Sequence, residues 1–129
     1  MTVIDTQVVL WMTHQPENLS VVAVRAISEA DLRGEVAIAD ITLNEVAMVL
    51  IRKRVEIDKP IDAYLRFVEE RFRVVPITGE IAIQAHRFGP AYPRDPADRL
   101  IGATVLVHGG RLVTADRAIC ASSEVPCVW

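Results

Sequence analysis

Short apolar runs alternate along the chain with segments of helical spacing, and this alternation constrains the fold more than any other feature. The predicted strands lie at residues 2–4, 36–38, within 72–77, at 112–113 and at 125–128. The predicted helices lie at 7–12, 21–32, 42–54, from 60 onward, at 78–88, 96–107 and 116–121. Such alternation is typical of parallel sheets covered by helices. We therefore predict one domain over residues 1–129, a three-layer α/β/α sandwich with a mostly parallel central sheet.

Composition narrows the classes of function. The formal net charge is −3, and 51% of the 129 residues are hydrophobic. The chain can therefore bury a core, and it lacks the strong positive charge of proteins that coat nucleic acids. An enzyme acting on phosphodiesters is still compatible with this charge, because bound metal ions can supply positive charge locally.

The cysteines and the hydropathy pattern predict a cytoplasmic protein. Cys120 and Cys127 are the only cysteines and have no metal-binding partners at suitable spacing, so we expect free thiols. We expect no signal peptide, because no charged segment followed by an apolar one opens the chain. No apolar run is long enough for a membrane span.

Five carboxylates stand where predicted helices begin: Asp5, Glu45, Asp95, Asp98 and Asp116. Each has a structural interpretation when taken alone. Residues 42–45 have the pattern of a capping box, and Asp95 precedes a proline as an N-cap residue would. Acidic side chains in a first helical turn also interact favourably with the helix dipole.

Taken together, the acids indicate a metal site. In a parallel sheet the carboxyl ends of the strands share one edge, where ligand crevices form. Asp5 and Asp116 closely follow predicted strands, and Glu45 and Asp98 lie on helices that can start at the same edge. Unpaired carboxylates at close range repel one another, so a divalent cation is the natural counter-charge. Hard oxygen ligands favour Mg²⁺ or Mn²⁺ over zinc.

The order and spacing of four segments resemble the PIN-domain ribonucleases, especially the VapC-type toxins of toxin–antitoxin pairs. These segments are residues 5–6, 40–45, 95–101 and 112–116, and the stretch 74–78 between the second and third acids fits as well. The resemblance extends from residue 3 to residue 129.

This resemblance implies a Mg²⁺- or Mn²⁺-dependent endoribonuclease that leaves a 5′-phosphate and a 3′-hydroxyl. The catalytic and metal-binding positions fall on Asp5, Glu45, Asp98 and Asp116. Asp95 matches an accessory acid. Thr114 matches a hydroxyl position that would orient Asp116 or hold a water. In one departure from the pattern, residues 93–94 are Pro-Arg where relatives often have a histidine.

The resemblance also implies partners, namely an RNA substrate, a cognate antitoxin that covers the acidic crevice, and a second copy of the chain in a homodimer. Arg94 and Arg99 flank the acids and are candidates for binding RNA phosphates. Solvated arginines, or arginines paired along a helix, are the alternative.

Two other functions remain open. A PIN-like module that binds RNA or protein without turnover would keep the fold, but it has no physical reason to keep mutually repelling acids. An aspartyl phosphatase would need a second aspartate two residues after Asp5, where Gln7 stands. A phospho-receiver domain would need its phosphorylated aspartate after a middle strand, whereas Asp116 follows a late one.

Overall fold

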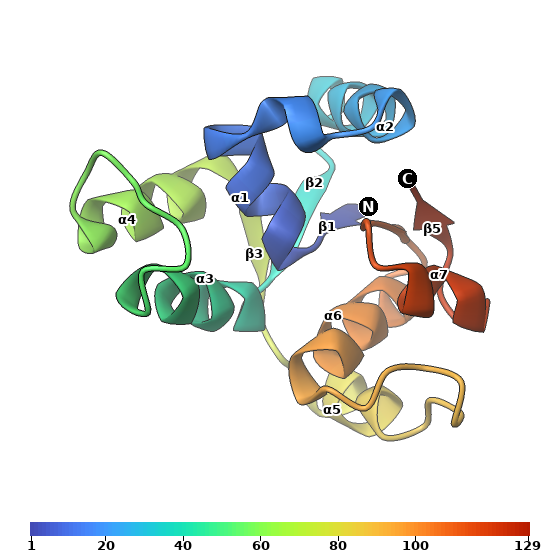
Figure 1. Ribbon diagram of the computed structural model, residues 1–129. Coiled ribbons are helices and arrows are strands. Elements are labelled where there is room, and N and C mark those ends of the chain that lie inside the picture. The colour runs from blue at the N-terminus through green and yellow to red at the C-terminus, as the bar shows by residue number, and fades with distance from the viewer.

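Five parallel strands form the centre of the computed structural model, which describes residues 1–129 (Figure 1). They pair in the order β3-β2-β1-β4-β5, and every pairing is parallel. The strands are β1 (Thr2–Ile4), β2 (Val36–Ala39), β3 (Arg73–Val75), β4 (Arg111–Val113) and β5 (Cys127–Val128). The predicted sandwich with a mostly parallel sheet is confirmed, and the sheet is in fact wholly parallel.

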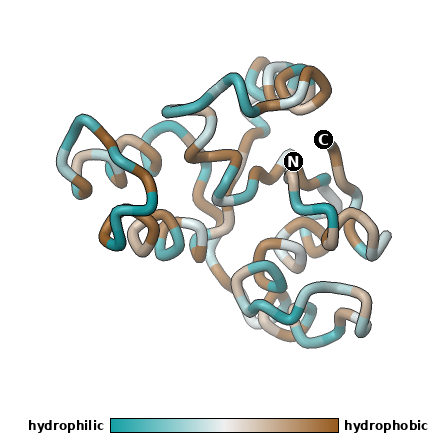
Figure 2. Tube along the Cα trace, viewed as in Figure 1, coloured by the Kyte–Doolittle hydropathy of each residue, from teal (hydrophilic) through white to brown (hydrophobic).

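Seven α-helices cover the sheet, and a short 3₁₀ helix (Pro16–Asn18) follows the first of them. They are α1 (Thr6–His14), α2 (Val21–Leu32), α3 (Ile41–Ile51), α4 (Ile61–Arg71), α5 (Gly79–Ala85), α6 (Pro96–Val107) and α7 (Arg117–Ser122). Figure 2 shows hydrophobic segments recurring through these helices and the strands between hydrophilic stretches. No helix is long and apolar enough to cross a membrane.

The sheet separates two apolar cores because neighbouring residues of a strand point to opposite faces. Ile4 and Ile38 pack with buried residues of α1, α2, α3 and α4. Val3 and Ala37 pack with buried residues of α5, α6 and α7 on the other face. Burial on both faces explains why the strands read as continuous apolar runs rather than as alternating patterns.

The strand order creates a crevice beside the first strand. The chain runs from β1 outward to β3, then returns through α5 and α6 to place β4 on the other side of β1. The helix after β1 packs in one core, and the helix after β4 packs in the other. The chain segments that follow β1 and β4 therefore leave toward opposite faces of the sheet, which makes this the switch point where ligands bind in open parallel sheets.

The prediction for the third helix was wrong in two respects. The helix α3 begins at Ile41 and ends at Ile51, whereas we predicted residues 42–54. Asp40 precedes it, so residues 42 and 45 lie too far inside the helix to form the predicted capping box. The Asp40 carboxylate instead accepts a hydrogen bond of 2.9 Å from the Ile77 amide, which ties the start of α3 to the segment after β3.

Candidate active site

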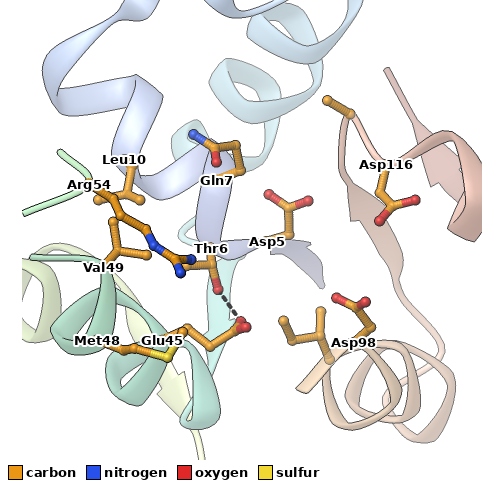
Figure 3. A pocket seen from close by; sticks show the side chains of 12 residues that line it. Asp5, Thr6, Gln7, Leu10, Glu45, Met48, Val49, Arg54, Asp98 and Asp116 are labelled. Atoms are coloured by element: carbon orange, nitrogen blue, oxygen red, sulfur yellow. Dashed lines mark hydrogen bonds between the residues drawn. The ribbon is translucent and has the colours of Figure 1, made fainter. Parts of the chain in front are cut away.

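Four carboxylates from four different elements line one cavity of about 440 Å³. Asp5 follows β1, Glu45 lies on α3, Asp98 lies in the first turn of α6, and Asp116 follows β4. Figure 3 shows their carboxylates turned toward a common space. The structure thus brings together the four acids that the sequence pattern singled out, at the switch point of the sheet.

A buried hydroxyl joins the two acids that follow strands. Thr114 is fully buried, and its hydroxyl donates a short hydrogen bond to Oδ2 of Asp5. Oγ1 of Thr114 in turn accepts a hydrogen bond of 3.0 Å from the amide of Asp116. Thr114 therefore holds Asp5 and the backbone at Asp116 in fixed relation across the switch point.

Asp5 and Asp116 also cap helices. Oδ1 of Asp5 accepts a hydrogen bond of 2.8 Å from the Val8 amide at the start of α1. Oδ1 of Asp116 accepts from the amides of Ala118 and Ile119 at the start of α7. The capping interpretation is thus correct for both residues, and it orients their carboxylates at the cavity wall.

Glu45 is oriented by the neighbour of Asp5 rather than by its own helix. The hydroxyl of Thr6 donates a hydrogen bond of 2.5 Å to Oε1 of Glu45 (Figure 3). Burial is the main cause that raises the pKa of Glu45, and the negative charge of Asp95 adds to the effect. The bond links α3 to the first turn of α1.

The carboxylate of Asp98 makes no hydrogen bond within the protein. Burial, followed by repulsion from Asp95, Asp116, Glu45 and Asp5, raises its pKa to about 7. Burial likewise raises the pKa of Asp5 to about 6, although its bonds from Thr114 and Val8 act against the rise. An acid left without donors among other acids is destabilised in its charged form.

The backbone of Asp98 is nevertheless firmly held. The hydroxyl of Tyr92 donates a hydrogen bond of 2.8 Å to its carbonyl oxygen, and the Tyr92 ring stacks on Phe88 at 3.9 Å between centroids. Gly102, one turn further along α6, leaves room for this hydroxyl and for the Phe88 ring. The loop before α6 thus fixes the start of the helix.

The cavity suits a hard divalent cation. All four acids offer oxygen ligands, and none of the three ion pairs in the structure involves them. Burial, and after it repulsion from the neighbouring acids, raises the pKa of both Asp98 and Asp5, so their charged forms are disfavoured where no cation is bound. No three of these carboxylates already converge closely enough to form a ready-made metal site. Binding an ion would therefore require these carboxylates to move toward one another.

Asp95 has a different place from the other four. It is exposed and does not line the cavity. Its Oδ1 caps α6 by accepting hydrogen bonds from the amides of Ala97 and Asp98. Its charge still reaches the cavity, since it raises the pKa of Asp98. An accessory role would therefore act through charge and through the start of α6.

The two predicted phosphate-binding arginines lie outside this cavity. Arg94 and Arg99 line a second hollow between α5 and α6, together with His86. Arg99 donates hydrogen bonds to the carbonyl oxygens of Pro93 and Ala85, at 3.0 and 3.4 Å. Adjacent residues on a helix point about 100° apart, so the residue after Asp98 faces another side of α6.

Sequence reasoning missed several lining residues. Thr6 directly follows a candidate acid, but nothing in the sequence indicates that its hydroxyl reaches α3. Arg54 lines the cavity from the turn after α3, within the stretch that we predicted as helix. Arg54 reaches the cavity because α3 ends at Ile51, before the predicted end at residue 54.

Comparison with known proteins agrees with this geometry. The family described as PIN domain matches residues 2–123. Ribonuclease VapC22 of Mycobacterium tuberculosis is 39% identical over 116 residues, which cover 90% of this chain and 87% of that protein.

Solved structures share the fold over almost the whole chain. A VapBC2 structure from Rickettsia felis, bound to promoter DNA, superposes with a TM-score of 0.72 at 11% identity, covering 98% of this chain and 96% of that one. VapBC-1 from nontypeable Haemophilus influenzae gives 0.71 at 14%, covering 98% and 95%. A toxin–antitoxin complex from Klebsiella pneumoniae gives 0.64 at 19%, covering 94% and 91%. At these identities the likeness concerns the fold.

Proposed function

Because the chain belongs to the PIN-domain family, and within it to the VapC-type proteins, we propose that it is a metal-dependent endoribonuclease acting as the toxin of a toxin–antitoxin pair. The observation that carries the proposal is the set of four unneutralised carboxylates, delivered by four elements to one cavity at the switch point. Carboxylates that repel one another lower the stability of the metal-free folded protein, and a role in catalysis explains why they lie together at this place.

Asp5, Glu45, Asp98 and Asp116 would hold Mg²⁺ or Mn²⁺ through their free oxygens. Such an ion supplies Lewis-acid polarisation of the scissile phosphate and an activated water. The protein's own part is orientation: Thr114 fixes Asp5, and Thr6 fixes Glu45. Hydrolysis would leave a 5′-phosphate and a 3′-hydroxyl. Within this scheme Asp95 tunes the charge of Asp98 and keeps the start of α6 in place.

The proposal includes a cognate antitoxin that inhibits the enzyme by covering the acidic cavity. It is supported by the structural neighbours, which include a toxin–antitoxin complex from Klebsiella pneumoniae and two VapBC structures. We further propose that the protein acts in the cytoplasm as a homodimer.

The test compares cleavage of structured RNA by the wild type and by Asp98→Asn, with Mg²⁺, with Mn²⁺ and with chelator. We expect metal-dependent cleavage that the substitution abolishes. Glu69→Gln on α4 removes an exposed carboxylate away from the cavity and serves as the control, which should cleave like the wild type.

Equal cleavage by Asp98→Asn would refute the site assignment. RNA binding without cleavage in either metal, across varied RNAs, would instead favour the non-catalytic PIN-like module.

A further inference from the structure

The cavity extends beyond the acids into an arm between α1 and α3. This α1–α3 arm is lined by Gln7, Leu10, Met48, Val49 and Arg54. Figure 3 shows Leu10, Val49, Met48 and Arg54 together on one side, away from Asp98 and Asp116. The arm therefore combines apolar side chains, one amide and one cation, next to a cluster of acids.

The backbone after α3 places Arg54 in the arm. The amide of Arg54 donates to the carbonyl of Val49, and the amide of Lys53 donates to that of Leu50, each at 3.1 Å. Lys53 has a φ of 51°. These features define a Schellman motif, in which the residue after the left-handed one folds back over the third-last helical residue. Here that pair is Arg54 and Val49, and both line the cavity.

Arg54 supplies the only basic side chain of the cavity. Its guanidinium forms no ion pair, although Glu45 lies in the same cavity, and it makes no side-chain hydrogen bond. The residue is exposed. Its donors are therefore free for a ligand, and guanidinium groups match phosphate oxygens in geometry and charge.

We propose that the α1–α3 arm is a nucleotide subsite, which binds the nucleotide next to the scissile bond, with Arg54 on its phosphate. Leu10, Met48 and Val49 contact its sugar or base, and the exposed amide of Gln7 is available to a base edge. The inference rests on the proposed ribonuclease function and adds the direction in which the RNA leaves the acids.

An RNA fits the arm better than an acidic peptide does. The phosphates of one strand recur at short, regular spacing, so a phosphate held among the acids places the next one a few ångströms away. A cation held by the four acids would offset their repulsion of the scissile phosphate, and an RNA strand then brings a regularly spaced second phosphate to Arg54. We therefore expect RNA to bind at Arg54, and the test below also shows whether a protein partner binds there instead.

The test measures binding of a fluorescent single-stranded RNA of mixed sequence in an Asp98→Asn background, with Mg²⁺ present, so that cleavage does not interfere. Arg54→Gln should weaken binding about tenfold or more, as expected for loss of a charge-assisted contact. The negative slope of log K against log salt concentration should become less steep by about 0.7, which is the value expected for the loss of one phosphate contact on a single strand. Arg54→Lys should restore part of the affinity.

The matched control is Arg52→Gln. Arg52 is exposed in the same turn, carries the same charge and does not line the cavity. If Arg54→Gln and Arg52→Gln weaken binding equally, the effect is general electrostatics and the subsite is refuted. Weakened capture of the antitoxin with unchanged RNA binding would also refute it.

Kinetics separate this inference from the proposed function. In the otherwise wild-type enzyme, Arg54→Gln should raise KM with kcat nearly unchanged, since the contact is made equally in the ground and transition states. RNAs shortened by one nucleotide on the arm side should lose their sensitivity to Arg54→Gln. Failure of Asp98→Asn to abolish cleavage would overturn the function, whereas failure of the Arg54 series would overturn the subsite alone.

Discussion

Replacing Asp98 by asparagine should stabilise the metal-free chain at alkaline pH while it abolishes RNA cleavage. The side chain of Asp98 accepts no hydrogen bond, so asparagine removes the charge without breaking a contact. Burial and four neighbouring acids raise the pKa of Asp98 to about 7 from its ordinary value of 3.8. The ionised form is therefore less favourable in the folded state than in the unfolded chain.

The size of the effect follows from proton linkage. Each pKa unit corresponds to about 1.4 kcal/mol, so a fully buried group with this pKa would cost about 4 kcal/mol when ionised. Asp98 keeps part of its surface in water, which screens the charge. We therefore expect Asp98→Asn to raise the free energy of unfolding by about 1–2 kcal/mol at pH 8, after this discount from the linkage value.

The pH dependence has a definite sign. The folded protein binds the proton on Asp98 more tightly than the unfolded chain does, so the contribution of Asp98 to stability is fully present below pH 3.8 and is lost as pH rises through about 7. The difference between Asp98→Asn and wild type should thus be near zero at pH 4 and reach its full value at pH 8. Urea denaturation with chelator at both pH values measures it.

The control is Glu69→Gln, which removes an exposed carboxylate that has no partner in the protein. It should change stability by less than about 0.5 kcal/mol at either pH. A destabilised Asp98→Asn at pH 8, or an equal gain at pH 4 and pH 8, would refute the view that Asp98 is an electrostatically strained acid.

Three further predictions concern the same site. At pH 8, Mn²⁺ at ten times its dissociation constant should stabilise the wild type by about 1.4 kcal/mol, by mass action, and should leave Asp98→Asn unchanged in a thermal melt. Thr114→Val should cost about 1–3 kcal/mol in urea unfolding, because the Asp116 amide and the Asp5 carboxylate lose a buried partner, and Thr114→Ser should recover most of it. Gly102→Ala should cost about 1–3 kcal/mol, since its methyl group would collide with the Tyr92 hydroxyl, whereas Gly79→Ala meets open space and should not destabilise.

Much of the fold was predictable because burial on both faces makes each strand an apolar run between helical segments. The helix α6 was predicted with the observed bounds, Pro96–Val107, because Asp95 and Pro96 mark its start and both fit their positions. The helix α3 was not, because its true end depends on Lys53 adopting a left-handed conformation, to which no glycine or asparagine gives a clue. Residues 52–54 are positively charged, and such charges are favourable in the last turn of a helix. The sequence therefore predicted them as the last turn of α3, whereas they form the turn that follows it.

The candidate acids, together with Thr114 beside Asp116, could be predicted as a group, but the other partners of the acids could not. Residues at helix starts after parallel strands must share an edge, which is a topological fact that sequence order conveys. The bond from Thr6 to Glu45 spans 39 positions and depends on how α1 leans on α3. The expectation for Arg99 depended on its nearness in sequence to Asp98, and helical geometry turned the two residues to different cavities.

The sequence left open whether these acids cap helices or bind a metal ion. In the structure some of their oxygens cap helices, while others accept no hydrogen bond. Oδ1 of Asp5 and Oδ1 of Asp116 cap helices, while Oδ2 of Asp116 accepts no hydrogen bond from the protein. Asp98 caps nothing, so both of its oxygens are free. A residue kept only for the helix would be expected to hold backbone amides, as Asp95 does. Asp98, the acid with the least structural use, has a pKa raised to about 7, against about 6 for the hydrogen-bonded Asp5, which is the distribution expected if Asp98 is retained for a cation.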